Sequence, residues 1–154
     1  TLAGVSKYLK EKKDDIKIFL SDPYGSALYN YYKKDELKAE GNSITEGIGQ
    51  GRITENLKHL VADDAVRIND KEALEMIFKL LKEEGLFLGG SSGINVCGAI
   101  KMAEKLGPGH NIVTILCDSG QRYQSKIWNK GFLKSKDLPF PSWMEWNERY
   151  FFIS

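Results

Sequence analysis

The stretch AVRINDKEALEMIFKLLKEEGLFLGGSSG, residues 65–93, decides the fold class of this sequence. It opens with a short run (65–68) that predicts a strand and continues into an amphipathic segment (69–85) that predicts a helix. The helix carries cap, capping-box and stop signals at Asn69, Glu72 and Gly85. A second apolar run (86–88) then breaks into GGSSG. The order strand, helix, strand indicates a parallel α/β sheet.

The same alternation continues on both sides of this stretch. Before it, a helix is expected from Leu2 and a short strand at 16–20; after it, a helix at about 92–106. The next run, NIVTILC (111–117), is nearly all apolar, which predicts a central strand covered on both faces. We therefore expect an α/β fold with an open, mostly parallel sheet and helices on both faces.

Composition narrows the class of protein. The chain has 154 residues, 42% of them hydrophobic and 28% charged, which is typical of one soluble globular domain. A net charge of +1 gives no basic field for nucleic acid, and no apolar run is long enough to span a bilayer. We expect a cytoplasmic protein without a nucleic-acid or membrane partner.

A metal site has no support in the sequence. Cys97 and Cys117 form no CxxC pair, and His59 and His110 stand alone. Both cysteines are interpreted as small buried apolar residues of a reducing compartment.

Domain organisation is read from the ends and from one long loop. The chain opens with a helix capped by Thr1, which is typical of a domain cut from a longer protein. We expect one α/β unit over 1–138 and an aromatic-rich extension over 139–154 that packs on other parts of the fold. The polar, glycine-rich stretch 21–52 is too long for a simple connector and is predicted to be functional.

Three glycine-rich segments are the candidates for a binding site: TEGIGQGR (45–52), LGGSSGIN (88–95) and CDSGQRY (117–123). GGSSG leads into a helix, so it could hold an anion at the helix N-terminus, or it could be an ordinary tight turn. No Walker A loop and no G-x-G-x-x-G is present. The alternating glycines of the first segment could be flexible, or they could let the backbone approach a flat ligand.

Four motifs in order carry a family resemblance: SDPYGSALYNYY, SITEGIGQGRITENL, EEGLFLGGSSGINVCGAI and TILCDSGQRYQSK. Together they resemble the C-terminal half of the cysteine synthase family, from Thr1 to about Leu138. These are pyridoxal-phosphate enzymes of the fold type II (tryptophan synthase β-like) group, which also holds cystathionine β-synthase.

The resemblance assigns cofactor contacts to Thr1, which matches the last threonine of a phosphate-binding loop, and to Ser119, which matches the serine that contacts the pyridine nitrogen. The remaining residues of the implied site line the cofactor and substrate cleft: Gly47, Ile48, Gly49, Ser91 and Ser92. Gly47 is also implied to contact the cofactor through its backbone, and a side chain there is expected to obstruct the site. For Ser91 and Ser92 a tight turn is an equal interpretation.

The implied reaction is β-replacement, in which O-acetylserine loses acetate and sulfide adds to give cysteine. The family's Schiff-base lysine lies in the N-terminal half, and no lysine of this chain matches it, so we expect the chain alone to be inactive. The resemblance also implies a homodimer and binding of the serine acetyltransferase C-terminal tail.

This sequence departs from the family pattern in two places. Cys117 stands where many relatives have proline, and the extension has some likeness to cystathionine β-synthase, which would use homocysteine instead of sulfide.

Two functions other than the enzyme stay open. A non-catalytic, truncated relative that binds a protein is a second class. A nucleotide-binding α/β domain is a third, although it lacks a phosphate fingerprint.

Overall fold

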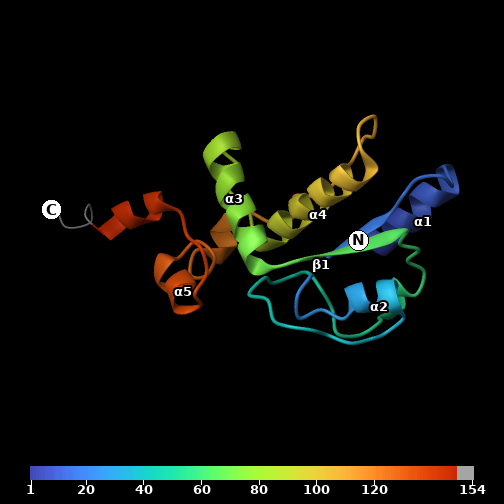
Figure 1. Ribbon diagram of the computed structural model, residues 1–154, viewed down its shortest axis with the longest axis horizontal. Helices are drawn as coiled ribbons and strands as arrows, with labels where there is room; N and C mark the ends of the chain where they lie inside the picture. Colours follow the sequence, from blue (N-terminus) through green and yellow to red (C-terminus); the bar gives the residue numbers. More distant parts are fainter. Residues whose placement is uncertain (149–154) are drawn as a thin grey trace.

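A computed structural model describes residues 1–148, with side chains to residue 145. Two strands alternate with helices and short 3-10 turns along the chain (Figure 1). The elements are α1 (Leu2–Lys12), β1 (Phe19–Pro23), α2 (Leu28–Lys34), η1 (Glu55–Leu57), β2 (Asp64–Ile68), α3 (Asp70–Glu84), α4 (Gly90–Leu106), η2 (Gly120–Tyr123), α5 (Lys130–Ser135) and η3 (Ser142–Glu148).

The two strands pair in parallel, with Phe19 opposite Asp64 and Pro23 opposite Ile68. A parallel pair needs a long crossover, which α2 and the loop after it provide. In Figure 1, α4 lies over one face of the strands and α2 lies below the other. The α/β class with parallel strands and helices on both faces is therefore confirmed.

Helix α3 forms where the sequence places it. The Asn69 side chain accepts a hydrogen bond from the Glu72 amide (2.9 Å) and the Glu72 carboxylate accepts one from the Asn69 amide (3.0 Å), so the capping box is complete. Gly85 ends the helix with φ +71°, a conformation that favours glycine. Leu74 and Ile77 bury the apolar face against the aromatic residues that follow η2.

The predicted strand at 111–117 is wrong in this structure. No strand or backbone-to-backbone hydrogen bond is assigned to these residues within the described part, and Val113 is 89% exposed. Only side chains of α4 hold the segment: Asn95 donates to the Ile115 carbonyl (2.9 Å), and Ser92 accepts from the Cys117 amide (3.0 Å). A strand needs a neighbour to pair with, and the described chain supplies none here.

Other expectations are partly corrected. The run 86–88 is no regular strand, since Leu88 alone makes an isolated antiparallel bridge, to Ser119. The long loop 21–52 contains α2, whose Tyr29 amide donates to the buried Asp22 carboxylate (2.8 Å). Because this bond satisfies an amide at the start of the helix, a buried acid at the end of β1 helps a helix begin in a segment read as loop.

The expectations for the ends and the cysteines have mixed outcomes. Residues of the extension do pack on the core, since Met144 is buried with α3 and Phe140 contacts the same cluster, whereas 149–154 lie outside the described residues. Cys97 is buried as expected, but Cys117 is exposed because its segment is uncovered. Within residues 1–148, no helix is long and apolar enough to cross a membrane.

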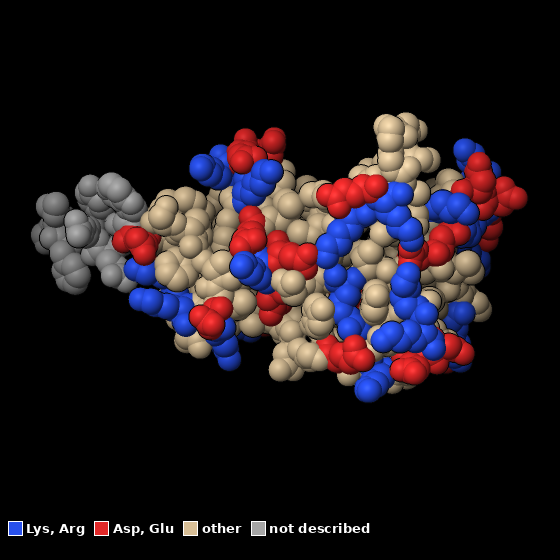
Figure 2. Space-filling view, viewed as in Figure 1, with Lys and Arg blue, Asp and Glu red and all other residues tan. Residues whose placement is uncertain are grey.

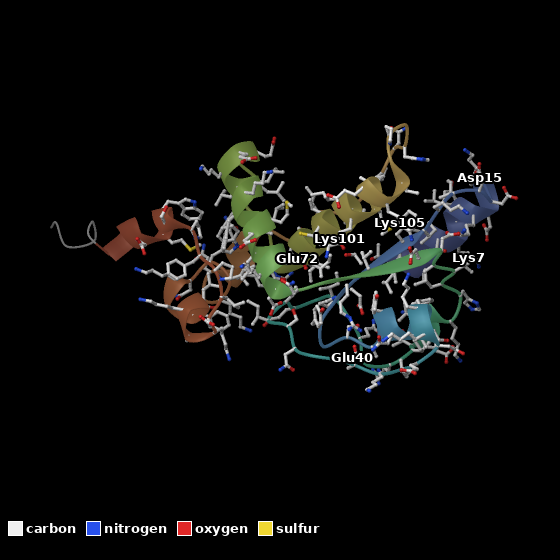
Figure 3. The ribbon with its side chains drawn as sticks, in the orientation of Figure 1. Lys7, Asp15, Glu40, Glu72, Lys101 and Lys105 are labelled. Atoms are coloured by element: carbon white, nitrogen blue, oxygen red, sulfur yellow. The ribbon has the colours of Figure 1, made fainter. Side chains whose placement is uncertain are left out.

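Asp64, at the start of β2, ties together helices on opposite faces of the sheet. Its carboxylate pairs with Lys33 at the end of α2 (2.5 Å) and with Lys105 near the end of α4. Figure 3 labels Lys105 on α4, and Figure 2 shows basic and acidic side chains interleaved on this face. The hydrogen bonds from Lys105 and then Lys33 hold the pKa of Asp64 well below its usual range.

Replacing Asp64 by asparagine should lower the free energy of unfolding by about 1 kcal/mol at neutral pH, because two partly exposed lysines lose their partner. The folded-state pKa is lowered, so this stabilisation is complete above the unfolded value of about 4 and is lost as pH falls through the folded pKa. Urea unfolding of wild type and Asp64→Asn as a function of pH measures the difference. The matched control is Asp15→Asn, which breaks an exposed pair with Lys13 (3.5 Å) and should change little at any pH.

Candidate functional site

The three glycine-rich segments meet at the carboxyl end of the sheet. A Cβ built at Gly90 would lie 3.1 Å from Thr45, which places the start of α4 against the first segment. Gly89 donates its amide to the Asp118 carbonyl (2.9 Å), which joins the second segment to the third. Gly49 packs on Pro23, the last residue of β1. In an open α/β sheet this is the side where ligands bind.

The first segment is a loop with two left-handed glycines, Gly47 (φ +78°) and Gly49 (φ +82°). A Cβ at Gly49 would lie 2.8 Å from Pro23, so this glycine is required by both conformation and space. At Gly47 no atom lies within 4 Å of such a Cβ, so the protein itself requires glycine there only for its conformation. Ile48 is half-buried, and with Gly49 it borders a hollow of about 490 Å³.

The second segment starts α4, with Gly89 as N-cap and no side chain capping the helix. Ser91 and Ser92 are both buried, at 4% and 0% exposure. The Ser92 hydroxyl is committed to the Cys117 amide, so in this structure it holds the third segment in place. Neither serine borders the hollow beside the first segment.

The third segment presents Ser119 on a braced turn. The Ser119 backbone makes an isolated antiparallel β-bridge with Leu88. The exposed Ser119 hydroxyl accepts a hydrogen bond from the Gln121 amide (3.3 Å). The neighbouring Asp118 carboxylate accepts a hydrogen bond from the Tyr123 hydroxyl, which raises the pKa of Tyr123. Trp128 braces the same turn by donating to the Leu88 carbonyl (3.1 Å). Tyr123 and Trp128 therefore hold the turn in place from the side of the core.

Thr1 stands apart from these contacts. It precedes α1, its carbonyl accepts from the Val5 amide (3.0 Å), and its exposed side chain caps nothing. Neither α1 nor α4 has an acidic residue in its first turn, so both helix N-termini keep their positive partial charge. Both termini therefore suit an anion, and the neutral Ser119 hydroxyl suits an aromatic ring nitrogen.

Two residues that position the site are not evident from sequence. Asp70 accepts hydrogen bonds from residues that lead into the glycine loop, and Ser26 holds Gln50 at the exit of the loop. The sequence feature that could have pointed to Asp70 is its place at the start of a predicted helix, directly after the carboxyl end of a predicted strand. A signal for Ser26 was the turn PYGS that follows β1.

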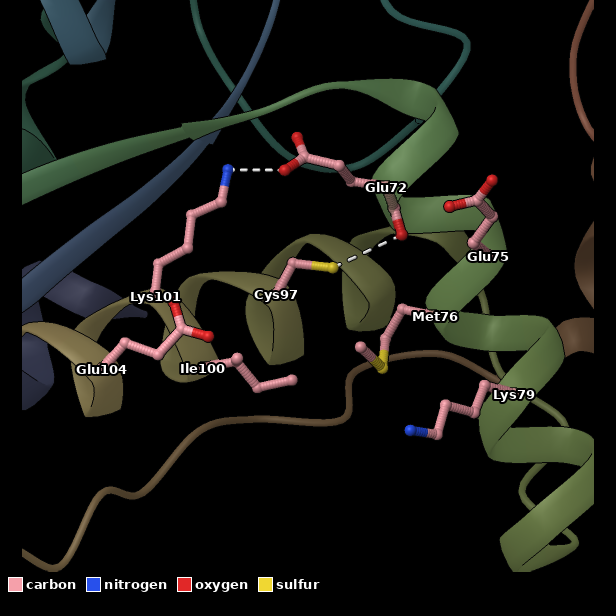
Figure 4. Close-up of a pocket in the computed structure, with 8 residues that line it drawn as sticks. All are labelled: Glu72, Glu75, Met76, Lys79, Cys97, Ile100, Lys101 and Glu104. Carbon is pink, nitrogen blue, oxygen red and sulfur yellow. Dashed lines mark hydrogen bonds and ion pairs between the residues drawn. The ribbon is translucent and has the colours of Figure 1, made fainter. Parts of the chain in front are cut away.

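A separate hollow lies between α3 and α4 and includes Cys97 and Glu72 (Figure 4). Cys97 donates its thiol hydrogen to the Glu72 carbonyl (3.4 Å), and burial raises the pKa of this thiol to about 11. A protonated thiol is a poor nucleophile, so this hollow is no second reactive site. No group of three or more His, Cys, Asp or Glu side chains suited to a metal occurs in the part of the chain that the structure describes.

Fold and site together define an α/β protein in which three glycine-rich segments lie together at the carboxyl end of the parallel strands. The chain belongs to the pyridoxal-phosphate dependent enzyme family, which matches residues 1–118. Members of this family depend on pyridoxal phosphate, and the neutral Ser119 hydroxyl and the uncompensated N-terminus of α4 fit it.

Curated proteins that match this chain indicate which members of the family it resembles. Cysteine synthase 1 of Neurospora crassa is 46% identical over 143 residues, and cysteine synthase 1 of Emericella nidulans is 48% identical over the same length. These matches cover 90% of this chain and 38% and 39% of the relatives, so the chain spans about two fifths of their length. The cystathionine beta-synthase of Oryctolagus cuniculus is 36% identical over 144 residues and covers 26% of that protein.

Two solved structures share the fold. O-acetyl serine sulfhydrylase isoform 3 of Entamoeba histolytica superimposes with a TM-score of 0.72 at 34% identity, covering 82% of this chain and 36% of that one. The O-acetylserine dependent cystathionine beta-synthase of Helicobacter pylori gives a TM-score of 0.72 at 35% identity, covering 82% and 39%. The predicted membership of the fold type II group is confirmed.

Proposed function

We propose that this chain is the part of a cysteine synthase that holds the pyridine ring of pyridoxal phosphate and the substrate amino acid. The observation that carries the proposal is the convergence of the glycine loop, the start of α4 and the Ser119 turn at the carboxyl end of the sheet. The reaction proposed for the protein is β-replacement on O-acetylserine by sulfide, giving cysteine and acetate.

Ser119 has a specific task in this proposal. The bound cofactor supplies an electron sink for the charge that develops at the substrate α-carbon. The Ser119 hydroxyl is neutral, so it would donate a hydrogen bond to the ring nitrogen and leave that nitrogen largely unprotonated. The nearby Asp118 carboxylate is engaged by Tyr123, which leaves the serine as the group presented to the ring.

The glycine loop supplies backbone rather than side chains. Gly47 and Gly49 have a backbone conformation that other residues rarely adopt, and Gly49 borders the hollow together with Ile48. A loop of this kind lets a substrate carboxylate or cofactor ring approach the main chain closely. Thr1 and the start of α1 are assigned to the cofactor phosphate.

Sulfide is proposed as the nucleophile because the relatives at 46% and 48% identity are named cysteine synthases, whereas the rabbit cystathionine beta-synthase is 36% identical. Homocysteine is the second candidate, because the Helicobacter pylori neighbour is an O-acetylserine dependent cystathionine beta-synthase. We further propose a homodimer that binds the tail of serine acetyltransferase.

The test is a chimera in which this chain follows the amino-terminal part of the Neurospora crassa cysteine synthase, up to the matched region. We expect cysteine from O-acetylserine and sulfide, and no cystathionine from homocysteine. Ser119→Ala should lower kcat about 10- to 100-fold, while Ser119→Thr keeps a hydroxyl and should retain most of the rate. Cystathionine as the only product would establish the second candidate, and a chimera that binds the cofactor without forming either product would favour a binding role.

A further inference from the structure

The glycine loop is held at its entry by one carboxylate. Asp70 accepts hydrogen bonds from the Ser43 hydroxyl (2.5 Å), the Ile44 amide (2.9 Å) and the Thr45 hydroxyl (3.4 Å). Ser43 in turn accepts from the Thr45 amide (3.0 Å). Both oxygens of one side chain therefore fix three successive residues that lead directly into Gly47.

Asp70 is itself placed on a rigid support. It is the first residue of α3 and follows Ile68, a fully buried residue of β2, by two positions. The capping box formed by Asn69 and Glu72 fixes this end of the helix. The carboxylate also lies where the helix dipole favours negative charge, so the anchor is fixed independently of the loop it holds.

The exit of the loop has a separate anchor. The buried Ser26 accepts a hydrogen bond from the Gln50 amide (2.9 Å) and donates to the Gln50 carbonyl (3.1 Å). The Ala27 amide donates to the same carbonyl (2.8 Å). Residues 46–49 therefore span between two fixed points.

We infer that Asp70 is a positioning residue of the site: it contacts no reacting group, but it sets where the glycine loop stands relative to the substrate and cofactor. The inference rests on the proposed function of the loop and deepens it. Removing the entry anchor should release residues 44–49 while leaving α3 folded, because the cap of the helix belongs to Asn69.

The first test is hydrogen exchange on the 154-residue chain. Asp70→Asn keeps the shape of the side chain but presents a donor where the loop needs an acceptor, so the amides of Ile44 and Thr45, which the anchor holds, should exchange about tenfold or more faster. The matched control is Glu75→Gln, the same acid-to-amide change at an exposed position of the same helix, which touches neither the loop nor the capping box. If the control speeds the loop as much, or if Asp70→Asn leaves it unchanged, the inference is overturned.

A second variant tests the hydrogen bond between Ser43 and Asp70 without changing the charge of Asp70. Ser43→Ala removes the hydroxyl from the loop side, and it should speed exchange in the same residues but add little on top of Asp70→Asn, because both remove one interaction. Fully additive effects would contradict a shared anchor.

The kinetic test uses the chimera. Asp70→Asn should raise KM for O-acetylserine severalfold, and Glu75→Gln should leave it unchanged; an equal KM in both variants would overturn the positioning role. A wild-type chimera without activity would count against the proposed function alone, since hydrogen exchange still decides whether Asp70 holds the loop.

Discussion

Gly93→Ala should destabilise the protein by about 2 kcal/mol or more, although alanine is the better helix former. Gly93 lies in the first turn of α4, where a Cβ would stand 2.3 Å from the Ala73 carbonyl oxygen and 3.0 Å from Ile77. The obstacle is backbone of α3 rather than the end of a flexible side chain. The two helices must therefore move apart, and buried contact is lost along their interface.

The consequence reaches the site, because Gly93 follows Ser91 and Ser92. A displaced α4 start would weaken the bond from the Cys117 amide to Ser92 and so loosen the Ser119 turn. We expect the midpoint of urea unfolding to fall in the Gly93→Ala variant and the exchange of amides in 117–123 to rise.

The control for this prediction is Gly4→Ala, in the first turn of α1. No atom lies within 4 Å of a Cβ at Gly4, so this variant should gain about 0.5–1 kcal/mol from the reduced entropy of the unfolded chain. Changes in stability of opposite sign at these two helical glycines would show that the effect of alanine depends on packing and not on helix propensity. A neutral or stabilising Gly93→Ala would mean that α3 and α4 yield more easily than the structure indicates.

Local signals explain how much of the fold could be predicted from sequence. Helix α3 was predictable to its boundaries, because Asn69, Glu72 and Gly85 act within one turn of their own positions. The start of α4 was placed two residues late, because Gly90 and Ser91 look like loop residues and enter the helix through packing against Thr45 and neighbouring elements. The tertiary environment overrides propensity there.

The site was predictable in its parts but not in its supports. The glycine loop and the Ser119 turn are continuous motifs, so a resemblance finds them. Asp70 is 26 residues from Ile44 in sequence, and Ser26 is 24 residues from Gln50; such pairs are joined only by folding. The local signals at these positions, a helix start for Asp70 and a turn for Ser26, do not distinguish an anchor, since an acidic residue at a helix start is common for reasons of capping alone.

Replacing Val113 and Ile115 by lysine should abolish self-association of the 154-residue chain. Val113 is 89% exposed and Ile115 52%, and their segment carries backbone groups that no strand of the described chain pairs. Exposed apolar side chains on an unpaired segment favour pairing with another molecule. If each side chain contributes about 1.5–3 kcal/mol when buried, removing both weakens association about a hundredfold or more.

Sedimentation velocity over a concentration series tests this, since wild type should shift to larger species and the double variant should stay monomeric. Val61→Lys is the control, because Val61 is 59% exposed but outside the segment, so its loss should leave association unchanged. The fold should survive the double substitution, because Asn95 bonds the backbone of Ile115 and not its side chain. A monomeric wild type would show that the apolar run 112–116 is tolerated in water, and the strand pattern in the sequence would then have no partner to explain it.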